Sequence, residues 1–82
     1  MRATFSPDID MAYLYLTEMG DGHFVGHTAP LIVDLPGGSR ALINLDFDAA
    51  GRLLGIEVHG ATASLPTAVL DGADRPGTLH SG

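Results

Sequence analysis

Apolar and polar side chains alternate along much of this chain, and the first clear run covers residues 11–17. A period of two is typical of a β-strand, because successive side chains of a strand point to opposite faces. One side of this strand carries Ala12, Leu14 and Leu16, and the other side carries Tyr13 and Tyr15. Residues 6–10 have turn composition, so residues 2–5 are predicted to form an opening strand that completes a first hairpin.

The pattern is less regular in the next stretch, where Gly20-Asp21-Gly22 breaks the chain. Apolar residues recur at 24–25 and at 31–35, and they predict either one strand or two short strands interrupted around Gly26 and Pro30. Both interruptions have a physical basis, because proline cannot donate to a strand ladder and glycine weakens a strand interior. Residues 36–39 are predicted to form a second turn.

The strongest prediction is a hairpin of residues 41–47 and 52–59 with a turn at 48–51. Pairing Ile43 with Ile56 and Leu45 with Leu54 keeps apolar side chains together on one face, whereas a slip of one residue would bury Asn44, Asp46 and Glu57. The predicted core face is Ile43, Leu45, Phe47, Leu54, Ile56 and Val58.

One short helix is predicted at residues 64–72, because Ser64 can cap its start, Pro66 fits the first turn and Gly72 suits its exit. Its apolar residues, Leu65, Val69 and Leu70, would pack on the sheet. The expected fold is therefore α+β: a small antiparallel sheet of about four or five strands with one short C-terminal helix on one face. Residues 1–71 would form a single domain, followed by a flexible tail at 72–82 that is rich in Gly, Pro and Ser.

Composition restricts the function. The chain has 82 residues and a net charge of −6, and it contains no cysteine. These features argue against a disulfide framework, a thiolate zinc site, a cysteine nucleophile and direct binding to nucleic acid or an anionic membrane. No apolar run approaches the ~20 residues that span a bilayer, so a cytoplasmic location is expected. A chain of this length forms a thin core, which makes self-association a natural source of further buried area.

Two segments resemble a known family, the bacterial domain-of-unknown-function family 2283. Phe5–Leu16 is similar to its opening motif, and Leu45–Val58 is similar to its aspartate-rich turn followed by Gly55-Ile56-Glu57. The resemblance covers about residues 3–70 and implies a compact α+β domain built on an antiparallel sheet. It implies no reaction. Some members resemble antitoxins encoded beside a small toxin, which implies a partner-binding role.

Two arrangements of possible metal ligands are present, and each has a simpler interpretation. Asp46, Asp48 and Glu57 imitate positions of a calcium-binding loop, but Ala50 removes an oxygen ligand, and strands flank the loop where helices would be needed. We expect aspartates that cap a hairpin turn, with Gly51 at positive φ. His23 and His27 are four residues apart, which would place them far apart on a strand. No catalytic residue, cofactor or metal ligand is therefore predicted.

The second face of the predicted sheet is the candidate interaction surface, because a single sheet with one short helix leaves one face uncovered. Its candidate interface residues are Tyr13, Tyr15, Leu42, Asn44, Leu53, Glu57 and His59, with Asp46 beside them. Tyrosine rings beside carboxylates are common at protein interfaces. Glu57 is predicted to lie opposite Leu42 and, if buried, to need an arginine such as Arg2, Arg40 or Arg52.

The leading hypothesis is a non-enzymatic protein–protein interaction module that binds itself as a homodimer or a small basic protein through the tyrosine-bearing face. The resemblance implies that such a module is antitoxin-like. An edge strand is a second possible contact. The alternative is a small metal-dependent hydrolase that uses His23, His27, His59, Asp46 or Glu57.

Overall fold

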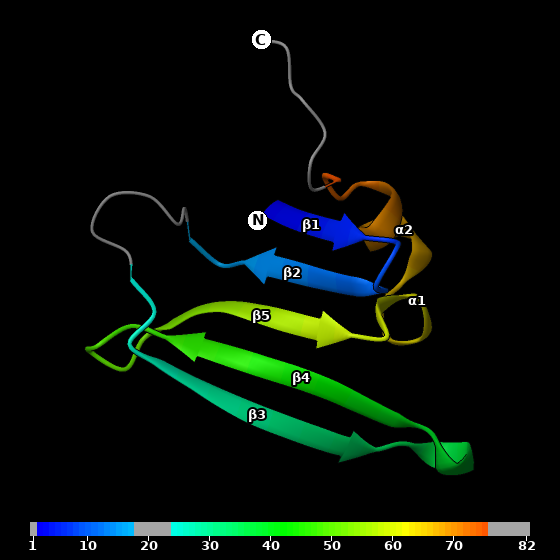
Figure 1. Ribbon diagram of the computed structural model, residues 1–82, viewed down its shortest axis with the longest axis horizontal. Helices are drawn as coiled ribbons and strands as arrows, with labels where there is room; N and C mark the ends of the chain where they lie inside the picture. Colours follow the sequence, from blue (N-terminus) through cyan, green and yellow to red (C-terminus); the bar gives the residue numbers. More distant parts are fainter. Residues whose placement is uncertain (1, 18–23, 76–82) are drawn as a thin grey trace, which may run out of the picture.

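The computed structural model describes residues 2–17 and 24–75. Five antiparallel strands form one sheet: β1 (Arg2–Ser6), β2 (Met11–Tyr15), β3 (His27–Asp34), β4 (Arg40–Phe47) and β5 (Leu53–His59). Their order across the sheet is β1-β2-β5-β4-β3 (Figure 1). The expected α+β fold with an antiparallel sheet is confirmed.

Strand β5 is the centre of the sheet, although it is the last strand in the sequence. It lies between the β1–β2 hairpin and the β3–β4 hairpin and pairs with β2 and β4 at once. Residues 55–59 of β5 have a ladder partner on both sides, and this strand contains three buried positions, Leu54, Gly55 and Val58. Strands β1 and β3 form the two edges.

Strand β3 differs from both sequence alternatives: residues 27–34 form one continuous strand that includes Pro30, whereas the predicted strand residues 24–25 lie outside it. Proline is tolerated there because an edge strand pairs on one side only. A 3₁₀ turn at Pro36–Gly38 connects β3 to β4, where a turn was predicted.

The β4–β5 hairpin has the predicted faces but not the predicted register. Ile43 pairs with Val58 and Leu45 pairs with Ile56, two residues away from the expected partners. The shift has two causes: the connection is one residue longer than predicted, and a bulge interrupts the ladder where Phe47 pairs with Leu53. Glu57 consequently lies opposite Asn44 and not opposite Leu42.

The hairpin turn is organised by Asp48. Its Oδ1 accepts hydrogen bonds from the backbone N–H groups of Ala50 and Arg52, each at 2.9 Å. Gly51 has a φ of 85°, which side chains disfavour and glycine adopts freely. The calcium-like sequence therefore forms the expected hairpin turn, in which the Asp48 carboxylate bonds the backbone of the turn.

Two short helices, α1 (Ala61–Ser64) and α2 (Thr67–Asp71), replace the single predicted helix. The prediction that Ser64 caps the helix is wrong, because Ser64 is the last residue of α1 and Pro66 precedes α2. Helix α1 is held instead by Asp10 of the β1–β2 turn, whose carboxylate accepts from the backbone N–H and the hydroxyl of Thr62 at 2.9 Å each. No helix in the described part of the chain is long and apolar enough to cross a membrane.

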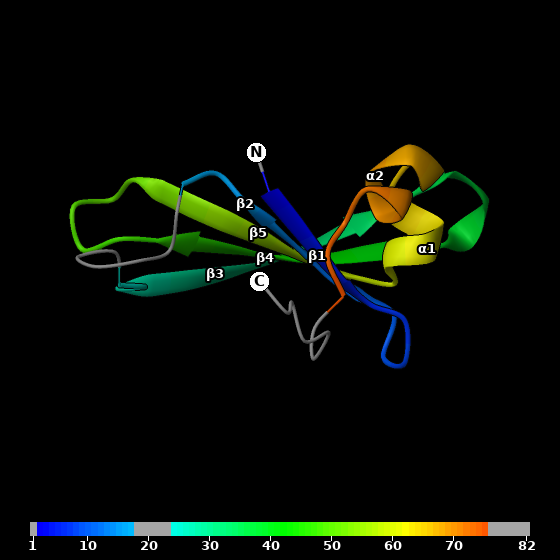
Figure 2. The ribbon, with the colours of Figure 1, turned by 90° about the horizontal axis from the view of Figure 1, so that it is seen from above.

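The main core cluster lies at one end of the sheet, and the other buried apolar residues, Ala41, Leu54 and Val58, lie outside this cluster. Phe5 and Ala12 of the sheet pack with Ala61 of α1 and Leu70 of α2, and Leu65 and Ala73 pack against this cluster. Figure 2 shows both helices gathered at this end of a twisted sheet. The expected helical cover of the apolar face is therefore only partial, because two segments of four and five residues cannot reach across five strands.

The chain continues past α2 along the edge of the sheet. Asp74 bridges to Thr4, and its backbone bonds to Ala3 and Phe5 of β1 at 2.9 and 2.8 Å. The guanidinium of Arg75 lies over the Phe5 ring, 4.9 Å from its centroid. These contacts protect the β1 edge, and the rest of the expected tail, 76–82, lies outside the described residues.

Candidate functional site

The face opposite the helices, which we call the tyrosine face, carries the candidate residues in rows across the strands. One row runs from Tyr13 through Glu57 to Asn44, and a second row runs from Met11 through His59 to Leu42. Because β5 lies between β2 and β4, residues from both hairpins share this surface. The tyrosines are half-buried on it.

Tyr13 reaches diagonally across β5 to β4. Its hydroxyl donates to Oδ2 of Asp46 at 2.7 Å, and the hydroxyl of Thr28 on β3 donates to Oδ1 of the same carboxylate at 2.5 Å. The ring can take this path because it crosses Gly55, where an added Cβ would clash with the ring and its hydroxyl. Glycine in the middle of β5 therefore leaves the space that the tyrosine occupies.

The environment of Tyr13 keeps its hydroxyl protonated. Desolvation by its neighbours raises the pKa of Tyr13 above its ordinary value, and the hydrogen bond to Asp46 and the nearby carboxylates raise it further. A neutral hydroxyl can donate to Asp46, whereas a phenolate would repel it. Tyr13 is thus a fixed donor on this face and not a proton-transfer group at neutral pH.

The second tyrosine joins an aromatic and cationic contact at the β1 edge. The ring centroids of Tyr13 and Tyr15 are 4.6 Å apart with planes tilted by 57°, within the range of favourable aromatic pairs. The guanidinium of Arg2 lies 4.3 Å from the centroid of Tyr15, a cation–π distance. This contact confines the one arginine of β1 at the margin of the face.

A second polar cluster surrounds Glu57. Asn44 donates from its side-chain amide to Oε1 of Glu57 at 2.9 Å, and Nε2 of His59 lies 3.0 Å from the same oxygen. The side chain of Glu57 is 34% exposed, so it is half-buried. Its partners are an amide and a histidine rather than the arginines considered from the sequence, since Arg2 lies over Tyr15 and Arg40 bonds Asp34.

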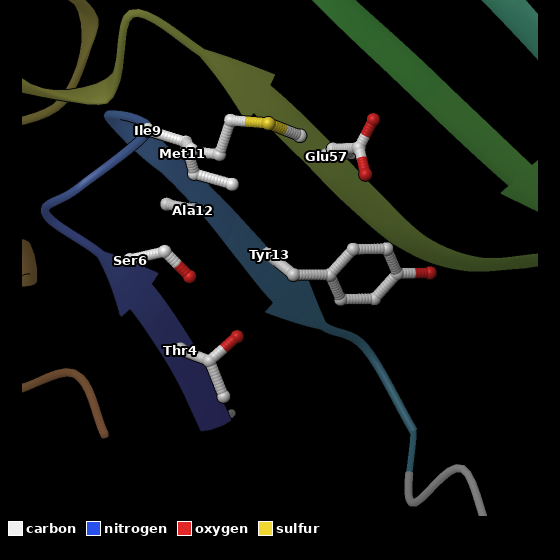
Figure 3. A pocket seen from close by; sticks show the side chains of 7 residues that line it. All are labelled: Thr4, Ser6, Ile9, Met11, Ala12, Tyr13 and Glu57. Atoms are coloured by element: carbon white, nitrogen blue, oxygen red, sulfur yellow. The ribbon is translucent and has the colours of Figure 1, made fainter. Parts of the chain in front are cut away.

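A shallow depression lies between β1, β2 and β5 on the same face. Its lining includes Thr4, Ser6, Met11, Tyr13 and Glu57, and its volume is about 220 Å³ (Figure 3). The thioether of Met11 and the ring of Tyr13 provide apolar walls, and the Glu57 carboxylate stands at the rim. Among the described residues, both hydrogen bonds to Glu57 end on Oε1, so Oε2 remains available to a ligand.

Six of the seven candidate interface residues lie together on this face. The seventh, Leu53, begins β5 beside the bulge. His27 falls elsewhere, because β3 and β4 place it with Phe47 on the opposite face, with ring centroids 6.4 Å apart. His23 lies outside the described residues.

The described candidate metal ligands bond to different partners and do not converge on one point. Asp46 serves Tyr13 and Thr28, and Asp48 serves the hairpin turn. Within residues 2–17 and 24–75, no group of three or more His, Asp or Glu side chains has a geometry that could hold a metal ion.

Sequence reasoning missed Thr28, Gly55 and the contact between Arg2 and Tyr15. Gly55 had a usable signal, since a glycine inside an otherwise apolar strand indicates a bulge or a close approach. Thr28 had none, because its bond to Asp46 depends on the register of β3 against β4.

Comparisons with protein-family models, curated proteins and solved structures find no match to this chain. The resemblance described above therefore rests on the two quoted segments alone.

Proposed function

We propose that this domain is a non-enzymatic protein-interaction module whose tyrosine face binds a basic segment of a small partner protein. The observation that carries the proposal is the half-exposed Glu57 carboxylate at the rim of the depression, with Oε2 directed to no described side chain. A lysine or arginine side chain suits this site, because its aliphatic stem can lie along Met11 and its charged head can reach Glu57.

Charge supports a basic partner. The chain carries −6 overall, and Asp46 adds a second carboxylate to the same face. The arginines of the strands are already engaged, Arg2 over Tyr15 and Arg40 with Asp34. A basic segment would be steered toward this face and would bind less tightly as salt increases.

The side chains of the face are already ordered. Tyr13 is held by Asp46, Asp46 is also held by Thr28, and Glu57 is held by Asn44. A partner therefore meets residues that lose little further freedom, which favours binding. The antitoxin-like association implied by the resemblance fits the same description, with a small basic toxin as the partner.

The alternative of a metal-dependent hydrolase has less support. Of its described candidate residues, His59, Asp46 and Glu57 lie on the tyrosine face, but His27 lies beside Phe47 on the opposite face. The Glu57–His59 pair alone offers neither a third ligand nor a nucleophile.

The direct test is co-purification with the product of the adjacent gene at low salt. The full chain should retain this protein, and Glu57→Gln should weaken binding about tenfold, since the amide keeps the Asn44 bond but loses the charge. Asp71→Asn is the matched control, because it removes one exposed carboxylate from α2 and should change binding little.

A second probe needs no knowledge of the partner. In an NMR titration with a short arginine peptide, we expect shifts concentrated at Thr4, Met11, Tyr13 and Glu57. Equal loss of binding in Glu57→Gln and Asp71→Asn would reject the tyrosine face as the binding site. Chemical-shift changes spread evenly over the acidic turns would reject it as well.

A further inference from the structure

The apolar face of the sheet is only half covered. The helices pack over Phe5 and Ala12, while the same face over β3, β4 and the start of β5 carries no helix (Figures 1 and 2). We call this region the open apolar patch; it consists of Ala29, Leu31, Ile43, Leu45, Phe47 and Ile56. Leu31 is 45% exposed, and the other five residues are half-buried.

The patch is free of carboxylates and arginines. Strand alternation and register place every Arg, Asp and Glu of the five strands on the tyrosine face: Arg2, Asp34, Arg40, Asp46 and Glu57. The only titratable strand residue on the apolar face is His27. A basic partner would find no charge to pair with on this surface.

The monomer buries few apolar side chains by itself. Its buried apolar residues are seven in number within the described chain, and three of them are alanines. A small domain with so thin a core commonly gains stability by burying more apolar area against another chain. The patch is the part of the apolar face that no helix covers, so it can supply such a gain.

The dimensions of the molecule set an upper limit on the area of such an interface. The molecule measures 42 × 35 Å across and 18 Å in thickness. Half of that 42 × 35 Å footprint is on the order of 700 Å², which is an upper limit for the area that this half of the sheet can contribute, against the ~800 Å² that each partner contributes to a standard interface. Sheets pack face to face about 10 Å apart, so the uncovered half of this sheet can receive another sheet directly.

We propose that the open apolar patch is covered by a second copy of this chain, which packs sheet against sheet in a two-fold dimer. Two chains of charge −6 repel each other unless they meet through a surface without charge, and this patch is such a surface. A two-fold arrangement opposes each patch to itself, and leucine, isoleucine and phenylalanine are self-complementary in chemistry. The dimer leaves both tyrosine faces outward, so it is independent of the partner binding proposed above.

The neighbouring residues Leu31 and Ile32 provide the test, because they lie on the same edge strand and point to opposite faces. Both side chains are exposed, 45% for Leu31 and 64% for Ile32, so a carboxylate at either position should leave the monomer fold intact. Leu31→Glu and Ile32→Glu also change the net charge equally. Their molar masses would be measured by light scattering over a range of concentrations, with circular dichroism to verify folding.

The wild-type chain should have twice its monomer mass of 8.5 kDa, and Ile32→Glu should keep that mass. Leu31→Glu should raise the dimer dissociation constant at least about 100-fold, because each copy would have to bury a carboxylate. A monomeric wild-type chain would overturn the proposal. Dissociation by Ile32→Glu alone would assign the dimer to the tyrosine face, and equal dissociation by both would indicate pairing of β3 edges; either result also overturns it.

Discussion

The two faces of this sheet are built from alternate residues of the same five strands, yet they satisfy their side chains in different ways. On the tyrosine face, polar groups pair with one another, as Tyr13 does with Asp46 and Asn44 does with Glu57. On the opposite face, apolar groups need a cover, and the chain supplies one only at the end where Phe5 meets Leu70. The first face can remain in water, whereas the second is incomplete in the monomer.

This difference explains how a short chain can present two surfaces at once. Hydrogen bonds on the tyrosine face are local and directional, so this face is ordered without a partner. Burial on the apolar face is non-directional and grows with area, so its uncovered half gains by association. In our proposals, binding to a basic segment and self-association therefore use separate surfaces.

The largest expected effect concerns the covered end of the apolar face. Leu70 is 8% exposed and joins the helices to the sheet. Leu70→Ala should lower the free energy of unfolding by about 2–4 kcal/mol, through lost burial and the cavity left behind. Urea unfolding followed by circular dichroism measures this loss.

The matched comparison for that variant is Leu45→Ala in the open apolar patch. Its cost should grow with protein concentration, because part of it comes from the dimer, whereas the cost of Leu70→Ala should not. Concentration-independent losses of the same size at both positions would contradict the distinction between a covered and an open half.

An intermediate effect is expected where Tyr13 crosses the central strand. In Gly55→Ala the new methyl group would occupy the position of the ring, so the ring must move and the bond to Asp46 must break. We expect a loss of about 1–2 kcal/mol in the free energy of unfolding. The sign should reverse in a Tyr13→Ala background, because alanine is preferred to glycine in a strand once the ring is absent. A loss of equal size in both backgrounds would show that the ring does not require Gly55.

The smallest effect concerns the hydroxyl of Tyr13. Tyr13→Phe should cost about 1 kcal/mol at neutral pH, the net value of one hydrogen bond. The pKa of Tyr13 is raised in the folded chain, mainly by desolvation. The stabilising contribution is therefore fully present below the unfolded pKa of about 10 and is lost as pH rises toward the folded value.

Unfolding measured from pH 7 to 11.5 should consequently show the wild type losing more stability above about pH 10 than Tyr13→Phe. Tyr15→Phe is the control, since it keeps Tyr13 and should keep the alkaline loss. Identical alkaline behaviour of wild type and Tyr13→Phe would contradict the assigned role of the hydroxyl.

The alternation of side chains was sufficient to predict β2, β4 and β5 and their faces, because a period of two ties each residue to one side, but it did not predict the bounds of β3. It could not predict the register of β4 against β5. Moving the pairing of Ile43 by two residues keeps every side chain on its own face. The alternation of apolar and polar residues therefore cannot distinguish the two registers. The added loop residue and the bulge at Leu53 have no signal in the alternation.

The site shows the same limit. The alternation of side chains along the strands placed Tyr13, Glu57 and Asn44 on one face. The hydrogen bond from Tyr13 to Asp46, however, depends on β5 lying between β2 and β4. That order joins residues 33 positions apart in the sequence, and no local pattern encodes it. The helical cover was overestimated for a related reason, since apolar residues such as Leu65 and Val69 do not indicate how far a helix extends over the sheet.

The central claim is that the apolar face is covered by a second chain in solution, whereas the tyrosine face remains exposed to solvent. Methyl NMR with a soluble paramagnetic probe tests this claim most directly. The wild-type chain would be observed at neighbouring positions that alternate between the faces, Leu31, Ile32, Leu42 and Ile43. We predict strong broadening of the Ile32 and Leu42 methyl groups and protection of Leu31 and Ile43 in the dimer. Equal broadening of all four, or protection of Ile32 and Leu42 instead, would contradict the account.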